Sequence, residues 1–366
     1  MSGLRIPSGL QDITPCWLTR ALNGGGRQAG ASVRGYSVEA IAEGKGFMSQ
    51  LFRLRLDYDS GPAELPQTMI VKLPSADPQL RTIFDRLGQN KREVRFYIEL
   101  ASNVLLQTPR GYYCGIDPAN GNTVLILEDM SYARQGDSVA GCSLDEARRC
   151  IGQLARFQAA WWNSPLLDRY DWMPLKDAEA FVYQEMYAGA WESLVRKAGV
   201  GMPPKLRHLG DRLAPEVHRL KTQLSKSPRT IVHGDFRLDN CFFSTSGDCQ
   251  SVTVIDWEFC GRGRGAYDVA TFISETFSPE QRKKEEPGLL HEYHSILEDN
   301  GVSGYPFDEC LHDYRLSMLE VFVFWIVTGG YCDYEDERAK RYLRNTLERL
   351  DAAISDLAST EAVGLQ

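Results

Sequence analysis

The sequence predicts an α+β protein with two lobes, a β-rich N-terminal lobe (residues 1–130) and a mainly helical C-terminal lobe (residues 131–366). Three observations support this prediction. Short alternating or apolar segments, typical of strands, occur mostly in the first lobe. Longer segments with a helical period predominate in the second. At 366 residues, the chain is also long enough to form two sizeable cores.

The first lobe contains segments that alternate or are continuously apolar, bounded by turn residues. Leu51–Tyr58 shows the alternation of a half-buried strand most clearly, and an Asn-Gly pair within Asp117–Asn122 indicates a hairpin. Residues Gln79–Ala101 have a helical pattern instead. The predicted strands are Tyr36–Ala42, Leu51–Tyr58, Thr68–Leu73, Gly111–Gly115 and Thr123–Leu127.

The second lobe begins after a connector near Glu128–Gly136. Ser143 followed by Glu146 is a capping-box pattern, and it predicts a helix that runs to about Trp162. The remaining predicted helices are Ala178–Lys197, Lys205–Leu224 and most of the chain from Ala266 onward. Short strands are expected at Thr230–Val232, Cys241–Phe243 and Ser251–Ile255.

Composition excludes several classes of function. The formal charge of −8 and the pI of about 5.4 argue against nucleic acid or an anionic membrane as a partner. No apolar run is long enough to span a bilayer, and the first residues do not have the pattern of a secretory signal. The nine cysteines include no C-x-x-C pair, so neither a disulfide framework nor a zinc site is expected. Cytoplasmic residence is the resulting expectation.

The strongest chemical signal is the segment HGDFRLDN, residues 233–240, followed by a short apolar strand that ends at Asp256. Phosphoryl transfer needs a carboxylate to orient the attacking hydroxyl and accept its proton. It also needs oxygen ligands that hold Mg²⁺ against the phosphates. Asp235 has the place of the base, and Asn240 and Asp256 have the places of the metal ligands. A single Asp in a turn is usually a local cap, but the whole set favours the functional interpretation.

These motifs resemble the signature of the aminoglycoside phosphotransferase and choline kinase superfamily, a branch of the protein-kinase-like fold. Gly44–Ser49 and the region from Lys72 to the helix that follows it are more similar to the ecdysteroid kinase-like subgroup. The resemblance covers roughly residues 40–340, and the motifs in the second lobe are the more specific ones. It implies that Asp235 is the catalytic base and that Asn240 and Asp256 bind Mg²⁺.

Lys72 lies in the predicted strand TMIVKL, from which its ammonium group could reach the α- and β-phosphates of a nucleotide. Such a lysine needs an acidic partner. Glu93 and Glu99 both lie in the following helical segment, and the family pattern favours Glu93. A lone strand lysine would more often be a surface charge.

The segment Gly44–Ser49 joins two predicted strands, so it is the candidate loop over the phosphates. Gly44 and Gly46 would let the backbone approach closely, and Ser49 could donate a hydrogen bond. The segment has neither the G-x-G-x-x-G of protein kinases nor the lysine of a Walker A loop. A plain turn is the alternative.

The last strand of the first lobe leads into LILEDM, where the family has its hinge. Backbone groups of Glu128 and Met130 are the expected contacts to a purine edge, although a plain linker would also pass here. Backbone contacts do not distinguish ATP from GTP, so ATP is the default cofactor, with Mg²⁺.

Several other residues have structural explanations. His233 is expected to brace the catalytic loop, and Arg237 to contact either phosphate or a carboxylate. Asp268 fits a helix cap or a first-turn acid, and the family has a structural Asp there. The glycine-rich Gly261–Gly265 is expected to form a flexible bend, and Trp161–Trp162 to lie in the core.

The sequence does not identify the acceptor, the molecule whose hydroxyl would receive the phosphoryl group. An acidic cluster comprises Asp333, Glu335, Asp336 and Glu337, which could bind an amine or simply favour the start of a helix. Trp161, Trp162 and Tyr331 could form an aromatic wall. The prediction is a kinase of a small-molecule hydroxyl, with an antibiotic or another natural-product alcohol favoured. The alternatives are a protein kinase, whose His-Arg-Asp and Asp-Phe-Gly motifs are missing here, and a nucleotide-binding scaffold without activity.

Overall fold

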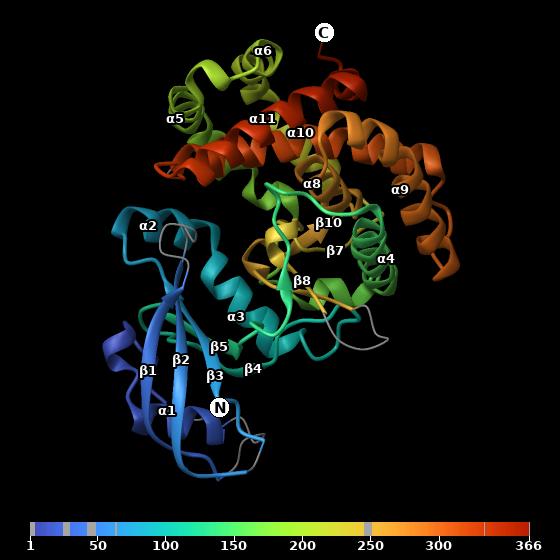
Figure 1. The fold of residues 1–366 in the computed structure, drawn as a ribbon. Coiled ribbons are helices and arrows are strands. Elements are labelled where there is room, and N and C mark those ends of the chain that lie inside the picture. Colours follow the sequence, from blue (N-terminus) through green and yellow to red (C-terminus); the bar gives the residue numbers. More distant parts are fainter. Residues whose placement is uncertain are drawn as a thin grey trace. The chain divides into compact units, whose positions relative to one another are not determined.

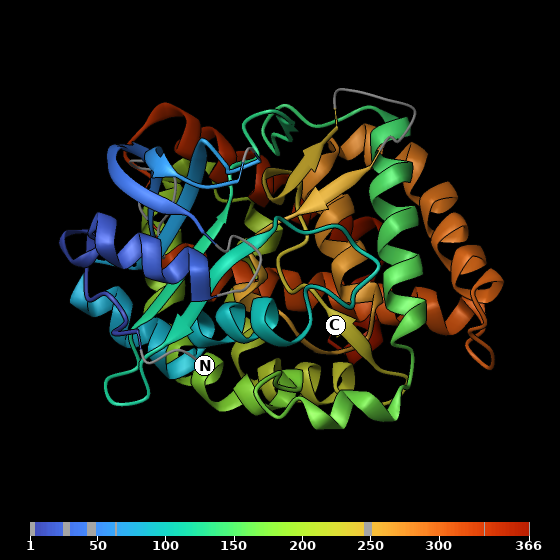
Figure 2. The same ribbon diagram turned by 90° about the horizontal axis from the view of Figure 1, so that it is seen from below.

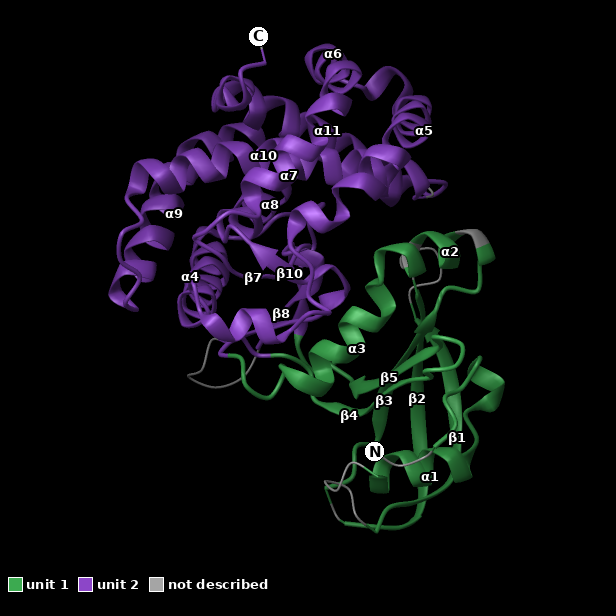
Figure 3. Ribbon diagram, turned by 180° about the vertical axis from the view of Figure 1, so that it is seen from behind, with its two compact units in different colours: residues 1–104, 108–133 green, residues 105–107, 134–366 purple. Residues whose placement is uncertain are grey.

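The computed structural model describes residues 4–24, 30–41, 49–62, 64–244, 251–332 and 334–365, and only the backbone of residues 79 and 84. The chain divides into two compact units (Figure 3). Unit 1 comprises Met1–Val104 and Thr108–Ala133, and unit 2 comprises Leu105–Gln107 and Arg134–Gln366.

Unit 1 contains a five-stranded sheet in the order β1-β2-β3-β5-β4, with every neighbouring pair antiparallel (Figure 1). The register pairs Leu51 with Lys72 and Lys72 with Leu125. Lys72 therefore lies on the central strand of the sheet. The strands are β1 (Ser32–Ile41), β2 (Ser49–Ser60), β3 (Thr68–Pro74), β4 (Gly111–Ile116) and β5 (Thr123–Glu128).

One face of this sheet is covered by a helix that the sequence analysis did not predict, α1 (Pro15–Gly24). Leu18 and Leu22 of α1 belong to the same buried cluster as Leu54 and Val71 of the sheet. The hydroxyl of Thr14 accepts a hydrogen bond from the backbone N–H of Trp17 at 3.1 Å, which caps the first turn.

The helical segment predicted after β3 is two helices, α2 (Pro78–Leu87) and α3 (Gln89–Glu99). Gly88 separates them in a left-handed conformation, with φ of +68°. The buried face of α3 includes Val94, Phe96 and Glu93. This helix therefore brings a carboxylate into the interior of unit 1.

Unit 2 is mainly helical, and its centre is the long apolar helix α10. This helix packs against α5, α7 and α8, and α4 lies beside α9 in both views (Figures 1 and 2). The helices are α4 (Leu144–Ala160), α5 (Ala180–Ala198), α6 (Pro204–Leu213), α7 (Val217–Leu224), α8 (Ala266–Thr276), α9 (Pro279–Asp299), α10 (Phe307–Tyr331) and α11 (Glu337–Asp356).

Helix boundaries in unit 2 follow local chemistry. The predicted capping box is confirmed at α4, where the Ser143 hydroxyl accepts from the Glu146 amide and the Glu146 side chain accepts from Ser143. The segment predicted as one helix over Lys205–Leu224 is two, because Pro215 lies in a short 3₁₀ turn between them. Asp336 of the acidic cluster caps α11, and Asp333 lies outside the described residues.

Short strands in unit 2 flank the segment HGDFRLDN. β7 (Thr230–Val232) pairs with β10 (Gly261–Gly263), and β6 (Arg134–Gln135) pairs with β8 (Cys241–Phe243), which pairs with β9 (Val252–Val254). The prediction of a flexible bend at Gly261–Gly265 was wrong. A Cβ at Gly263 would lie 3.0 Å from the carbonyl oxygen of Leu224, so this strand needs small residues to pack.

In the described part of the chain, no helix is both long enough and apolar enough to cross a membrane.

Close packing of α10 against α5 gives a stability prediction. A Cβ at Gly330 would lie 2.4 Å from the carbonyl oxygen of Ala190, and backbone cannot move aside easily. We expect Gly330→Ala to lower the free energy of unfolding by about 1–3 kcal/mol in denaturant titrations. Gly189→Ala is the matched control, because a Cβ there meets nothing within 4 Å and should stabilise α5. Equal effects of the two variants would contradict this packing argument.

Candidate active site

The candidate catalytic loop runs from His233 to Asn240, between strands β7 and β8 of unit 2. Its last three residues form a 3₁₀ turn, Leu238–Asn240, closed by a hydrogen bond from the Asn240 amide to the Arg237 carbonyl at 3.0 Å. Asp235 is 5% exposed and Asn240 is 3% exposed. The loop therefore presents its polar groups from an almost completely buried backbone.

Gly234 is required by the shape of this loop. Its φ of +87° is in the left-handed region, and a Cβ would lie 2.2 Å from the carbonyl oxygen of Phe259. Any other residue would clash with backbone in addition to adopting an unfavourable conformation. This explains the glycine between the histidine and the aspartate.

Asp268, in the first turn of α8, stabilises the loop through hydrogen bonds. Its carboxylate accepts hydrogen bonds from the amides of His233 at 2.7 Å and Gly234 at 2.9 Å, and from the Gln158 side chain at 3.1 Å. Burial raises the pKa of Asp268, and the hydrogen bonds that it accepts from the two loop amides oppose this effect. The predicted structural role is therefore specific: Asp268 binds the catalytic loop and does not cap its own helix.

His233 braces the loop through both ring nitrogens. The Asp235 amide donates to Nδ1 at 3.2 Å, so Nδ1 carries no proton, and Nε2 then donates to the Ile255 carbonyl oxygen at 2.9 Å. Burial lowers the pKa of His233, which keeps the ring neutral. His233 thereby links the catalytic loop to the strand end that carries Asp256.

The Asp235 carboxylate is held by two donors from its own loop. Arg237 Nε lies 3.1 and 3.0 Å from the two carboxylate oxygens, and Asn240 Nδ2 donates to Oδ2 at 3.0 Å. Burial raises the pKa of Asp235, Arg237 opposes that effect, and the nearby negative charge of Asp256 adds to it. Asp235, Asn240 and Asp256 are therefore brought together within unit 2.

Asp256 follows β9 in an unusual conformation. Its φ of +69° is rare for a residue with a Cβ and is a form of local strain. The preceding residue is tied to the catalytic loop, because the Ile255 amide donates to the Asn240 carbonyl oxygen at 3.0 Å. The backbone thus fixes the position of Asp256 relative to Asn240.

In unit 1, the structure brings Lys72 and Glu93 together. Lys72 Nζ on β3 lies 2.7 Å from the Glu93 carboxylate on α3, and the two side chains are 12% and 3% exposed. Glu99, the alternative partner, instead lies 3.5 Å from Arg95 on its own helix. A buried carboxylate holds the lysine ammonium in a fixed direction.

Of the other residues predicted to bind the nucleotide in unit 1, some are described by the structure and some are not. Gly44 and Gly46 lie outside the described residues. The hydroxyl of Ser49, at the start of β2, is buried and has no hydrogen-bond partner among the described residues. The Glu128 amide donates to the Arg110 carbonyl oxygen, and the Met130 carbonyl oxygen accepts from Ala133.

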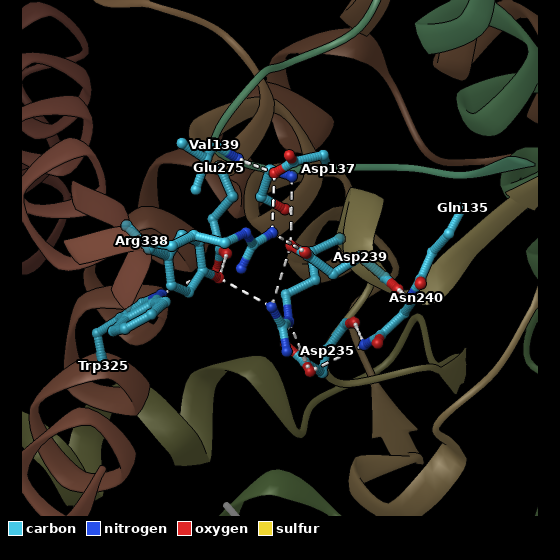
Figure 4. Close-up of polar contacts among 12 residues, drawn as sticks. Gln135, Asp137, Val139, Asp235, Asp239, Asn240, Glu275, Trp325 and Arg338 are labelled. Carbon is cyan, nitrogen blue, oxygen red and sulfur yellow. Dashed lines mark hydrogen bonds and ion pairs between the residues drawn. The ribbon is translucent and has the colours of Figure 1, made fainter. Parts of the chain in front are cut away.

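Sequence reasoning missed a set of residues in unit 2 that surround Arg237 (Figure 4). Tyr342, Asp239 and Arg338 belong to it, and the first two bind Arg237 directly. Asp239 lies inside the HGDFRLDN motif, but one of its partners, Arg338, comes from helix α11, 99 residues later. No local pattern in the sequence connects the two segments.

Comparison with known families decides the classification. The model of the ecdysteroid kinase-like family matches residues 43–301, well over half of the chain. The chain belongs to the ecdysteroid kinase-like family. Membership places it among kinases of small molecules, in agreement with the resemblance seen in the sequence. No curated protein matches the sequence.

Solved structures with a similar fold include choline kinase from Cryptosporidium parvum Iowa II, at 14% identity and a TM-score of 0.55, covering 90% of this chain and 92% of that one. Ethanolamine kinase from Plasmodium vivax has 13% identity and a TM-score of 0.50, covering 86% and 82%. The GDP complex of wild-type aminoglycoside 2'-phosphotransferase-IIIa has 16% identity and a TM-score of 0.50, covering 89% and 93%. The predicted protein-kinase-like α+β fold is confirmed.

The role of Asp268 gives the prediction for this site. In Asp268→Asn, an amide N–H₂ replaces one acceptor oxygen, so one loop amide loses its partner at a cost of about 1–3 kcal/mol. We expect hydrolysis of Mg·ATP to fall at a temperature where the variant remains folded. Asp313→Asn is the control, since Asp313 is a buried carboxylate that binds Arg264 and Tyr305 instead of the loop. A comparable loss of activity in both variants would contradict a specific role for Asp268.

Proposed function

We propose that this protein is a magnesium-dependent kinase that transfers the γ-phosphoryl group of ATP to a hydroxyl of a small molecule. The observation that carries the proposal is the buried Asp235, held by Asn240 and Arg237 and close enough to Asp256 for the two carboxylates to affect each other. Family membership supports the general reaction, and the side chains of the loop suggest how it proceeds.

Asp235 is the proposed base. Its carboxylate would accept a hydrogen bond from the acceptor hydroxyl and take its proton as the oxygen attacks phosphorus. Burial raises the pKa of this carboxylate, which makes it a stronger base, while Arg237 opposes that rise and favours the charged form. The donors on Arg237 and Asn240 also fix the direction of the carboxylate.

The residues present fit Mg²⁺. Asn240 directs its amide nitrogen to Asp235, which leaves the amide oxygen as the atom that would bind a metal. Asp256 supplies a carboxylate, and an all-oxygen set is the one that Mg²⁺ prefers. The repulsion that Asp256 exerts on Asp235 is also what a bound cation would relieve. When bound, Mg²⁺ would neutralise charge on the phosphate oxygens.

Nucleotide binding is proposed for residues of unit 1. Lys72, aligned by Glu93, would contact the α- and β-phosphates, and the unpartnered hydroxyl of Ser49 would donate to a phosphate oxygen. The amide of Met130 is the donor proposed for a purine edge, since the amide of Glu128 is occupied by Arg110. The proposed roles of Gly44 and Gly46 concern residues that the structure does not describe. ATP is the proposed cofactor, with GTP as the alternative.

An antibiotic or another natural-product alcohol is the proposed acceptor, with antibiotic resistance as one biological outcome and the cytoplasm as the proposed location. The similar structures are named as kinases of choline, ethanolamine and aminoglycosides, so these compounds belong in any test. A protein kinase and an inactive nucleotide-binding scaffold are the alternatives.

The test is transfer from Mg·ATP to a panel of hydroxylated compounds, read by mass spectrometry. The panel contains aminoglycosides, macrolides, nucleoside antibiotics, choline, ethanolamine, simple sugars and sterols. We expect one phosphorylated product class, and we expect Asp235→Asn to lower kcat by about 10²–10⁴-fold because it removes the base. Nucleotide affinity should change little.

Three results would contradict the proposal. Full kcat in Asp235→Asn would show that another group is the base. Binding of Mg·ATP with no product and no ATP hydrolysis would favour the scaffold, and phosphorylation of added proteins would favour a protein kinase.

A further inference from the structure

One face of helix α11 contacts the surroundings of the catalytic loop. Arg338, Tyr342 and Arg349 are separated by four and seven residues, so they point to the same side of the helix. All three bind polar groups of the loop or of the segments that support it. Helix α11 lies beyond residue 301, where the match to the family model ends.

Tyr342 makes the most direct of these contacts. Its hydroxyl accepts a hydrogen bond from Arg237 NH1 at 3.0 Å and donates one to the Glu275 carboxylate at 2.7 Å. Since Arg237 Nε binds both oxygens of Asp235, a chain of three contacts runs from Glu275 to the proposed base. Each hydroxyl or guanidinium in the chain polarises the next.

The Glu275 side chain, at one end of this series of contacts, is held in place by its surroundings. It is fully buried on α8, and its second carboxylate oxygen accepts from the indole N–H of Trp325 on α10 at 2.9 Å. Burial raises the pKa of Glu275 to about 7, and Arg237 opposes that effect. With both oxygens engaged, Glu275 holds the Tyr342 hydroxyl in one direction.

A second set of contacts, made by Asp239, Arg338 and Asp137, also holds Arg237 in place (Figure 4). Arg237 NH1 lies 3.3 Å from Asp239, whose other oxygen binds Arg338 of α11 at 3.0 Å. Arg338 also binds Asp137 at 2.9 Å. The guanidinium of Arg237 is therefore fixed between α11 and its own loop.

Arg349, toward the C-terminal end of this face of α11, contacts the same network of residues. Its guanidinium is buried and donates to the Ser138 carbonyl oxygen at 2.8 Å and to the carbonyl oxygen of Glu275. The Ser138 amide in turn donates to Asp239 at 3.3 Å. Arg349 thus connects the two sets of contacts that hold Arg237, one through Glu275 and the other through Ser138 and Asp239.

We propose that α11, acting through Tyr342 and Arg237, is the positioning element of the catalytic base. The inference rests on the proposed function, in which Asp235 is that base. Within the loop, Asn240 binds one carboxylate oxygen of Asp235. Among the described residues, Arg237 is the only one found to bind both oxygens. A small error in carboxylate direction lowers the rate strongly, because a misplacement of about 1 Å costs on the order of 10²-fold.

The experiment compares Tyr342→Phe with a matched control, Tyr314→Phe. Tyr314 also donates from a buried position to a buried glutamate, Glu286, at 2.7 Å, but it has no contact with the loop. Turnover is measured as Mg·ATP hydrolysis and, where the panel yields a product, as transfer. We expect Tyr342→Phe to lower kcat by about 10- to 100-fold with KM for ATP within about 2-fold. Tyr314→Phe should leave kcat unchanged.

A double-mutant cycle tests whether Tyr342 acts through Arg237. Arg237→Gln should lower kcat more than Arg237→Lys, which retains a cationic donor to Asp235. In the Arg237→Gln background, Tyr342→Phe should have no further effect, because their contact is already lost. Wild-type kcat in Tyr342→Phe, or independent effects of the two substitutions, would overturn the inference.

A readout that does not need turnover separates this inference from the proposed function. The Arg237 Nε–H resonance, assigned by its loss in Arg237→Lys, should exchange slowly with solvent in the wild type. Tyr342→Phe should accelerate its exchange and Tyr314→Phe should not. An inactive wild type with this pattern would contradict the proposed function and still support the positioning contact. Unchanged exchange in Tyr342→Phe would overturn the positioning contact.

Discussion

The catalytic loop depends on one buried carboxylate, Asp268, which accepts hydrogen bonds from two successive loop amides. These bonds stabilise a backbone that passes through the left-handed conformation of Gly234. A carboxylate can accept from both donors at once, one at each oxygen. The direction of Asp235 follows from this loop shape, and so does the use of both His233 nitrogens. The first turn of α8 therefore determines where the chemistry can occur.

A second constraint is electrostatic. Asp235, Asp239 and Glu275 all lie in buried or half-buried positions near a single guanidinium, that of Arg237. Buried charges are costly unless they are paired, so Arg237 must remain between them. In the proposed function, a bound Mg²⁺ would add positive charge beside Asp256. Stability and the proposed reaction thus place related demands on the same few side chains, and the strained backbone of Asp256 agrees with the role proposed for that residue.

The sequence was sufficient for features that depend on local chemistry. The capping box at Ser143, the strand of Lys72 and the segment HGDFRLDN all have short-range patterns, and the structure places each in the expected element. It was insufficient where distant segments meet. Helix α1 was not predicted, although its buried residues Trp17, Leu18, Ala21 and Leu22 have helical spacing. Strand β10 was misread because glycine-rich composition suggests a bend. The contacts of Tyr342 with Arg237 join residues more than a hundred positions apart, which periodicity cannot reveal.

The most direct test of the central claim is electron paramagnetic resonance of Mn²⁺, used in place of Mg²⁺, titrated with ATP and protein. We expect a ternary complex of Mn²⁺, ATP and protein in the wild type and in Asp235→Asn. A weakened complex is expected in Asp256→Asn, because that substitution replaces a charged metal ligand. Equal binding in Asp256→Asn and the wild type, or ATP binding that needs no divalent cation, would contradict the assignment of this loop as a phosphoryl-transfer site.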